Sequence, residues 1–177
     1  LLFQLHYLQR AFIFPFLRKG KSRMPVAIMA MGIVFNLLNG MMQAGGLFYF
    51  APEGLYADGW AYLLKPHALL GIILFFAGMF VNLHSDYVIR HLRRPGDTKH
   101  YLPGKGLYRY VTSANYFGEL VEWTGFAILT ASPAAWVFVW WTFANLVPRA
   151  DAIHRRYREE FGDEAVGKRK RIIPFLY

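Results

Sequence analysis

Five long apolar blocks constrain the fold of this chain more than any other feature of its sequence. They cover residues 1–17, 25–50, 66–84, 114–131 and 133–147. A helix of about 20 mostly apolar residues is long enough to cross the hydrocarbon core of a bilayer. The pattern therefore predicts an all-α fold, a polytopic bundle of transmembrane helices with five spans in this chain.

The composition agrees with a membrane protein. Of the 177 residues, 55% are hydrophobic and only 18% are charged, less than the surface of a soluble domain of this length needs. The net charge of +9 would suggest a nucleic acid partner in a soluble protein, but basic residues in a membrane protein first report topology, so we expect no nucleic acid partner. The absence of cysteine excludes disulfides, thiolate metal sites and thiol catalysis.

Basic residues alternate between the loops that separate the blocks. The loops at 18–24 and 85–112 and the C-terminal tail are rich in arginine and lysine. By contrast, the second loop carries Glu53 and Asp58, and the turn at 132–133 has no charge. The positive-inside rule places basic loops on the cytoplasmic side of a membrane. We therefore expect the loops 18–24 and 85–112 and the C-terminus to be cytoplasmic.

The two ends of the chain lead to further expectations. Apolar residues recur at spacing four in Ile153, Tyr157 and Phe161, which predicts a short helix over residues 151–161 lying at the membrane surface. The chain opens at Leu1 inside an apolar run, so we expect further residues upstream of it. We see no linker or internal repeat, which favours one transmembrane domain over the whole chain.

Polar side chains inside the fourth block are the strongest sign of a functional site. Asn115, Glu119 and Glu122 share one helix face at positions i, i+4 and i+7. Carboxylates are costly at bilayer depth and need partners, for which the arginines and lysines of the third loop and the tail are the candidates. A proton relay or plain helix packing is the alternative. We expect no metal site, because the histidines lack ligand spacing.

Two other blocks also carry polar faces. Tyr7 and Arg10 share a face of the first block, where a tyrosine beside a cation is able to donate a strong hydrogen bond to a carbonyl oxygen; an interfacial aromatic and a snorkelling arginine are the alternative. Asn36, Asn39 and Gln43 share a face of the second block. These three amides either line a cavity or join two helices.

The third block ends in a polar and basic segment. Asp86 lies four residues before Arg90, so a helical ion pair is the simplest interpretation of both. Arg93 and Arg94 come just before a turn, where they either hold a phosphate or set the topology. Together, the blocks predict a polar pocket that opens to the cytoplasm and binds a phosphorylated, amide-bearing ligand.

Six short stretches of this sequence resemble the steroid 5α-reductase family, and the similarity extends over essentially all 177 residues. They are NLHSDY at 82–87, LRRPG at 92–96, GLYRYV at 106–111, ANYFGE at 114–119, EW at 122–123 and IPF at 173–175. Each is a weak signal alone, and it is their common order and spacing that carries the resemblance.

That resemblance implies a membrane-embedded enzyme with seven transmembrane helices, two of them upstream of Leu1. It implies NADPH as hydride donor and a Δ4-3-oxosteroid or similar lipid as acceptor, in the reaction of a 3-oxo-5α-steroid 4-dehydrogenase. We expect a monomer in contact with membrane lipids, in the endoplasmic reticulum of a eukaryote or the inner membrane of a bacterium. Hydride would reach C5, and a hydrogen-bond donor at the 3-oxo oxygen would stabilise the charge that builds there.

The resemblance also implies roles for individual residues. Tyr7 would be the catalytic donor and would contact the substrate together with Phe35 and Gln43, while the glutamate that assists it would lie upstream of Leu1. The cofactor-binding residues would be Arg10, Lys21, Asn82, Asp86, Arg93, Asn115, Glu119, Tyr157 and Arg169.

Two other functions fit the same sequence. One is a related NADPH-dependent reductase that acts on a polyprenol or an enoyl thioester, which would share the cofactor site. The other is a non-catalytic membrane protein that binds sterol or lipid. The carboxylates Glu119 and Glu122 count against a merely structural role, because buried charge of this kind is usually functional.

Overall fold

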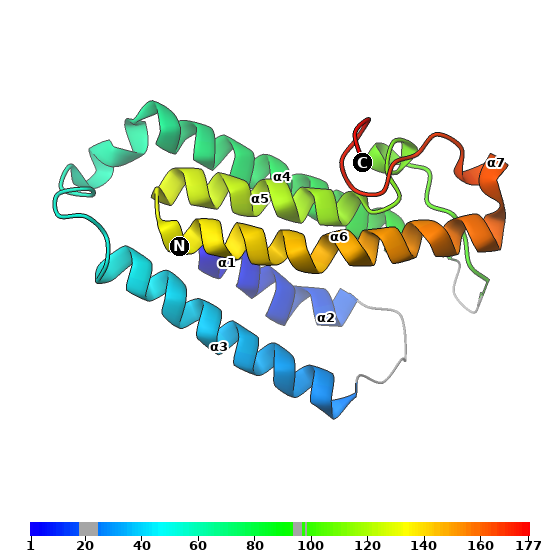
Figure 1. Ribbon diagram of the computed structural model, residues 1–177, viewed down its shortest axis with the longest axis horizontal. Coiled ribbons are helices and arrows are strands. Elements are labelled where there is room, and N and C mark those ends of the chain that lie inside the picture. Colours follow the sequence, from blue (N-terminus) through cyan, green and yellow to red (C-terminus); the bar gives the residue numbers. More distant parts are fainter. Residues whose placement is uncertain (18–24, 94–96, 98) are drawn as a thin grey trace.

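The computed structural model describes residues 1–17, 25–93, 97 and 99–177, and this part of the chain is helical (Figure 1). The prediction of an all-α fold is confirmed for it. The long helices are α3 (Val26–Phe48), α4 (Pro66–Arg90), α5 (Ala114–Thr130) and α6 (Pro133–Phe161). The short ones are α1 (Leu2–Leu8), η1 (Gln9–Ile13), α2 (Phe14–Leu17), η2 (Gly59–Leu64), η3 (Gly106–Arg109) and α7 (Asp163–Val166).

The first helix is continuous but contains one wide turn. Elements α1, η1 and α2 follow one another without a gap, and η1 is a π-helical turn in which the Phe14 amide bonds to the Gln9 carbonyl. Pro15 lacks an amide hydrogen and its ring crowds the carbonyl four residues earlier, which gives a physical reason for a wider turn just before it. Single π turns inside α-helices are frequent at functional sites. Here the π turn carries Arg10.

Helices α4 and α5 pack against each other backbone to backbone. Each presents two glycines seven residues apart, Gly71 and Gly78 on α4 and Gly118 and Gly125 on α5. A Cβ atom added at Gly78 would lie 2.2 Å from the Glu122 amide nitrogen, and at the other three glycines the nearest backbone atoms would be 2.4–2.5 Å away. Only glycine permits this approach, which holds the polar residues of the two helices at fixed relative positions.

The turn between α5 and α6 is as short as the sequence predicts. Ala131 takes the left-handed conformation at φ 48°, and Pro133 starts α6 in the first-turn position where a missing amide costs nothing. Helix α6 then runs to Phe161 without interruption. Its start lies beside the end of α3, because a Cβ atom at Gly46 would meet the Ala134 Cβ atom at 2.6 Å.

Residues 151–161 are helical as predicted, but they are the last part of α6 and not a separate helix; their position at the membrane surface stays a prediction. Pro148 removes one internal hydrogen bond, yet helix geometry continues on both sides of it. An ion pair at spacing four, Asp151 with Arg155, supports the helix beyond the proline. The spacing of Ile153, Tyr157 and Phe161 fits a continued helix as well as a separate one, so it could not reveal the boundary.

Helix α3 is attached to the bundle mainly at one end. Near its C-terminal end Gly46 approaches Ala134, whereas a Cβ atom added at Gly32 or Gly40 would have no neighbouring atom within 4 Å. In Figure 1 the N-terminal end of α3 diverges from the other helices. Large apolar side chains such as Val26, Met31 and Leu37 are more than 60% exposed along it.

Two helices, α3 and α4, are long and apolar enough to cross a membrane by length and composition. Only 11% of the most apolar stretch of α3 and 33% of that of α4 are buried inside the protein. Helix α5 has 17 residues and carries two carboxylates. The existence of five spans, the cytoplasmic side of the loops and the single-domain organisation remain predictions.

The C-terminal segment returns to the start of α5. The Thr112 and Ser113 amides donate to the carbonyls of Lys170 and Arg171 at 2.9 and 3.1 Å, and the Lys170 amide donates to Tyr110 at 2.8 Å. The Arg171 side chain also pairs with Asp151 of α6. These bonds fix the residues that lead into α5.

Candidate functional site

Polar residues from the first helix, α4 and α5 meet at the end of α4. The Arg10 guanidinium donates to one oxygen of Asp86 at 2.9 Å, and the Asn115 amide lies 3.5 Å from the other oxygen. Asp86 is buried, while the Arg10 side chain is 35% exposed. The predicted ion pair of Asp86 with Arg90 is therefore wrong: the preferred partner comes from the π turn of the first helix, 76 residues away, which helical spacing cannot reveal.

Asn115 links three elements at this point. Its backbone carbonyl accepts a hydrogen bond from the side-chain amide of Asn82 at 3.0 Å, and its side-chain oxygen accepts one from the Tyr108 hydroxyl at 3.4 Å. The close contact of Gly118 with Asn82 places the two asparagines together. Burial, together with the nearby charge of Asp86, raises the pKa of Tyr108, which stays a neutral donor. The predicted cofactor residues Asn82, Asp86 and Asn115, with Arg10, thus form one cluster.

Tyr7 lies on the same first helix, one turn before Arg10, and receives a hydrogen bond from α3. The Asn39 amide donates to the Tyr7 hydroxyl oxygen at 3.3 Å, and the Gln43 amide donates to the Asn39 side-chain oxygen at 3.2 Å. The Gln43 amide also donates to the Ala134 carbonyl of α6 at 3.2 Å. The Tyr7 ring packs on Phe3, with ring centroids 4.8 Å apart.

A buried histidine and carboxylate lie next to Tyr7. His6 Nδ1 is 2.9 Å from Glu122 Oε1, and the two residues are 6% and 0% exposed. The His6 ring packs on Trp123 with centroids 4.6 Å apart. The expectation that a lysine or arginine of the third loop or the tail would pair with Glu122 is wrong. The partner comes from the first helix instead.

Glu119 and Tyr157 complete the surroundings of the cluster. Glu119 lies on α5 between Asn115 and Glu122, partly exposed, within electrostatic range of the Tyr7 hydroxyl. Within the described part of the chain, no hydrogen bond engages its carboxylate. Tyr157 on α6 is close enough to Tyr108 to influence its ionisation, and burial raises the pKa of Tyr157 itself.

Lys21, which is predicted to bind the cofactor, lies outside the described residues. The remaining predicted residues do not join this cluster directly. Arg93 is exposed just beyond α4, and the Arg169 guanidinium donates to the Pro103 carbonyl at 3.2 Å. Phe35 packs on Phe138, with centroids 6.3 Å apart, in the aromatic core that also contacts Tyr7.

Three residues of the site were not predicted from the sequence to be site residues. They are His6, Tyr108 and Trp123, and each contacts a predicted residue through a hydrogen bond or a ring contact. Asn39 was predicted as part of an amide face, and His6 was visible as the neighbour of Tyr7. The roles of Tyr108 and Trp123 depend on contacts between distant segments.

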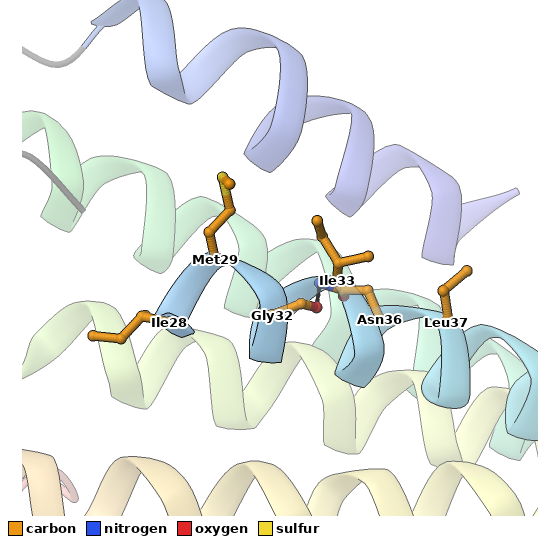
Figure 2. Close-up of a pocket in the computed structure, with 6 residues that line it drawn as sticks. All are labelled: Ile28, Met29, Gly32, Ile33, Asn36 and Leu37. Carbon is orange, nitrogen blue, oxygen red and sulfur yellow. Dashed lines mark hydrogen bonds between the residues drawn. The ribbon is translucent and has the colours of Figure 1, made fainter. Parts of the chain in front are cut away.

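A large surface hollow lies elsewhere, along α3. Its volume is about 610 Å³, and Figure 2 shows that all six lining residues come from this one helix. The lining is apolar except for Asn36, whose amide donates to the Gly32 carbonyl of its own helix at 2.8 Å. Asn36 shares the helix face predicted for Asn39 and Gln43, but it is exposed while the other two are buried. We therefore assign the candidate site to the polar cluster around Tyr7.

Comparison with known proteins shows to which family the sequence is similar. A sequence model of the family described as 3-oxo-5-alpha-steroid 4-dehydrogenase matches residues 22–177. The chain is 43% identical to 3-oxo-5-alpha-steroid 4-dehydrogenase 1 of Macaca fascicularis, over 99% of this chain and 65% of the relative.

Two human proteins are similar over the same share of this chain. The chain is 42% identical to 3-oxo-5-alpha-steroid 4-dehydrogenase 1 of Homo sapiens and 39% identical to 3-oxo-5-alpha-steroid 4-dehydrogenase 2 of Homo sapiens. Both alignments cover 99% of this chain and 66% of the relative. The chain thus spans slightly less than two thirds of the length of these relatives.

Proposed function

Because the chain belongs to the 3-oxo-5-alpha-steroid 4-dehydrogenase family, we propose that it acts as a membrane-embedded reductase that uses NADPH to saturate the Δ4 double bond of a 3-oxosteroid. The single observation that carries the proposal is the position of Tyr7. Its hydroxyl lies at the junction of the first helix, α3 and α5, and receives a hydrogen bond from Asn39. A phenol so placed suits the polarisation of a ketone oxygen.

The donor set around Asp86 fits a dinucleotide. Asp86 and Glu119 offer acceptors for ribose hydroxyls, the amides of Asn82 and Asn115 suit a carboxamide, and the partly exposed Arg10 suits a phosphate. Glu119 is partly exposed and shares a face of α5 with Asn115. When bound there, NADPH would supply a hydride equivalent.

Tyr7 would stabilise the charge that develops during the reduction. As C5 of the enone gains a hydride, negative charge moves to the 3-oxo oxygen. The Tyr7 hydroxyl would donate to that oxygen and bind the enolate-like transition state more tightly than the ketone. The aromatic core of Phe3, Trp123 and Phe138 would exclude water from this side of the donor. A proton added at C4 completes the product.

The exposed apolar surface supports embedding in a membrane. Helix α3 exposes most of its large apolar side chains, a surface that a soluble monomer rarely presents. The five helical blocks and the alternating basic loops support five spans with the loop 85–112 and the C-terminus on the cytoplasmic side. In that orientation the Arg10 and Asp86 cluster lies toward the side where cytoplasmic NADPH would enter.

The test is steroid-dependent oxidation of NADPH by membranes that contain the complete protein. With testosterone or progesterone, wild-type protein should consume NADPH and release the 5α-reduced steroid. Tyr7→Phe removes one hydroxyl, and loss of such a donor typically lowers kcat about 100-fold or more. Phe75→Leu, a change in the same aromatic core at a residue with no proposed role in binding, serves as the packing control. If neither steroid is reduced although the membranes bind NADPH, the substrate assignment fails.

A further inference from the structure

We propose that Asn39 is a positioning residue that directs the hydroxyl proton of Tyr7 toward the substrate carbonyl. The inference rests on the proposed function, because it concerns the donor assigned there. Its basis is a chain of hydrogen bonds from the Ala134 carbonyl through Gln43 and Asn39 to Tyr7, in which each amide has only one permitted orientation.

A backbone carbonyl sets the orientation of the Gln43 side-chain amide. The Ala134 oxygen has no hydrogen and is an acceptor only, so the group of Gln43 that faces it at 3.2 Å must be the amide nitrogen. The same nitrogen lies 3.2 Å from the Asn39 side-chain oxygen. Gln43 is 3% exposed, so its orientation is set inside the protein rather than by solvent.

Asn39 passes this orientation on to Tyr7. Its oxygen is engaged by Gln43, so its nitrogen faces the Tyr7 hydroxyl oxygen at 3.3 Å. An amide nitrogen donates but does not accept, so Asn39 is unable to take the Tyr7 proton. The Tyr7 hydroxyl oxygen therefore accepts a hydrogen bond from Asn39 on α3. The hydroxyl proton of Tyr7 can then be donated to another acceptor. Within the described residues, no hydrogen bond given by the Tyr7 hydroxyl is present.

This arrangement prepares Tyr7 for its proposed task in two ways. The proton needs no rotation away from a competing acceptor when a ketone arrives, which is the preorganisation that favours a transition state. A hydroxyl that accepts one hydrogen bond also becomes a stronger donor, because hydrogen bonds in a chain polarise each other. Asn39 thus acts through Tyr7 without touching the substrate.

The test compares variants of Asn39 in steroid-dependent NADPH oxidation by the complete protein. Asn39→Leu removes the bond to Tyr7 at similar volume, and we expect kcat to fall about tenfold with little change in KM. The loss should vanish when Tyr7 is already phenylalanine, because both changes act through one hydroxyl. Asn36→Leu, the same substitution at an exposed position of the same helix, is the control and should keep the wild-type rate.

Asn39→Asp provides a readout that a merely structural role would not change. An ionised carboxylate accepts the Tyr7 proton and turns it away from the ligand, whereas the protonated acid donates as asparagine does. The rate of Asn39→Asp relative to wild type should therefore fall as the pH rises, while that of Asn39→Leu stays level. In the infrared spectrum, a bound saturated 3-oxosteroid should show a higher carbonyl stretching frequency in Asn39→Leu than in wild type.

Two outcomes would overturn the inference, and they have different meanings. If Tyr7→Phe loses activity but Asn39→Leu does not, Tyr7 is the donor and Asn39 does not position it. If Tyr7→Phe itself keeps full activity, the proposed donor is wrong and the inference falls with it. Should Asn39→Leu fail to fold, Gln43→Leu is the second variant, because it frees the Asn39 amide to rotate. It should reduce kcat in the same Tyr7-dependent way, and an unchanged kcat would refute the proposed chain of hydrogen bonds.

Discussion

The α4–α5 pair and helix α3 attach to the molecule in opposite ways. Four glycines bring the backbones of α4 and α5 into contact along two turns, so a methyl group at Gly78 would overlap the Glu122 backbone. Helix α3 leaves Gly32 and Gly40 open and approaches the bundle closely at Gly46. The comparison teaches that four of the proposed cofactor residues, Asn82, Asp86, Asn115 and Glu119, lie on the closely packed pair, whereas the amides that orient Tyr7 come from the loosely attached helix.

The largest effect should follow from breaking the buried pair that joins the first helix to α5. His6→Ala leaves the fully buried Glu122 without a partner, and loss of one member of such a pair costs about 3–5 kcal/mol. Denaturant titration in detergent micelles measures the change. Asn36→Ala on the exposed face of α3 should change stability by less than about 0.5 kcal/mol. Equal losses in the two variants would show that burial inside the bundle does not distinguish these regions.

A matched pair of glycine substitutions tests the contrast directly. Gly78→Ala must push α4 away from the backbone of α5, and we expect a loss of about 3 kcal/mol. Gly32→Ala meets no neighbouring atom and should stabilise α3 by up to about 1 kcal/mol. The free energy of unfolding in the same detergent is the measurement. If both variants are equally stable, the close contact of α4 and α5 does not exist in solution.

The close contact of α3 at Gly46 should give an intermediate effect. A methyl group at Gly46 would lie 2.6 Å from the Ala134 Cβ atom and 2.8 Å from the Ser132 hydroxyl, both in side chains. Because the opposite end of α3 has few neighbours, the helix is able to shift, and we expect Gly46→Ala to cost about 1 kcal/mol. That shift should also weaken the bond of Gln43 to Ala134. A loss as large as that of Gly78→Ala would mean that α3 is held as rigidly as α4.

The smallest effect concerns the tail that holds the start of α5. The His154 ring lies 3.4 Å from the Thr112 hydroxyl, and burial, followed by the charges of Arg171 and Arg158, lowers the pKa of His154 below its ordinary value of 6.5. The pKa of His154 is lowered while the C-terminal tail is bound at the start of α5. This binding of the tail, which we call docking, is therefore fully stable above pH 6.5 and weakens as the pH falls below that value. Asp151 and Asp163 do not titrate in this window, because hydrogen bonds from Arg171 and Arg158 lower the pKa of each.

Hydrogen exchange at the Thr112 and Ser113 amides measures this docking. After correction for the intrinsic rate, exchange should be faster at about pH 5.5 than at about pH 7.5. His154→Gln should remove the difference, because glutamine does not titrate. Exchange that is slower at the lower pH would contradict the account.

The sequence predicted the helices better than their contacts. Apolar blocks and the Ser132-Pro133 turn located α3, α4, α5 and the start of α6, because length and hydropathy are local properties. The continuation of α6 through Pro148 was missed, since one proline ends some helices and is tolerated in others. The glycine contact between α4 and α5 was also missed, because it depends on how the two helices pack and not on the sequence of either one.

The same difference separates the site residues that were found from those that were missed. Asn82, Asp86 and Asn115 were assigned correctly to one cluster, through the resemblance to a family rather than through spacing. The partners of Asp86 and Glu122 were predicted wrongly, because local charge patterns favour neighbours such as Arg90, whereas the structure uses Arg10 and His6 of the first helix. Pairing across distant segments depends on packing that no local pattern records.

Isotope transfer tests the central claim most directly. Complete protein in membranes would be given a Δ4-3-oxosteroid and NADPH that carries deuterium at C4 of the nicotinamide, and the product would be analysed by mass spectrometry and NMR. The account predicts a 5α-reduced steroid with deuterium at C5 from one of the two C4 epimers of the cofactor, and a rate about 100-fold lower in Tyr7→Phe. A product without deuterium at C5 from either epimer, or no reduction of the steroid, would contradict it.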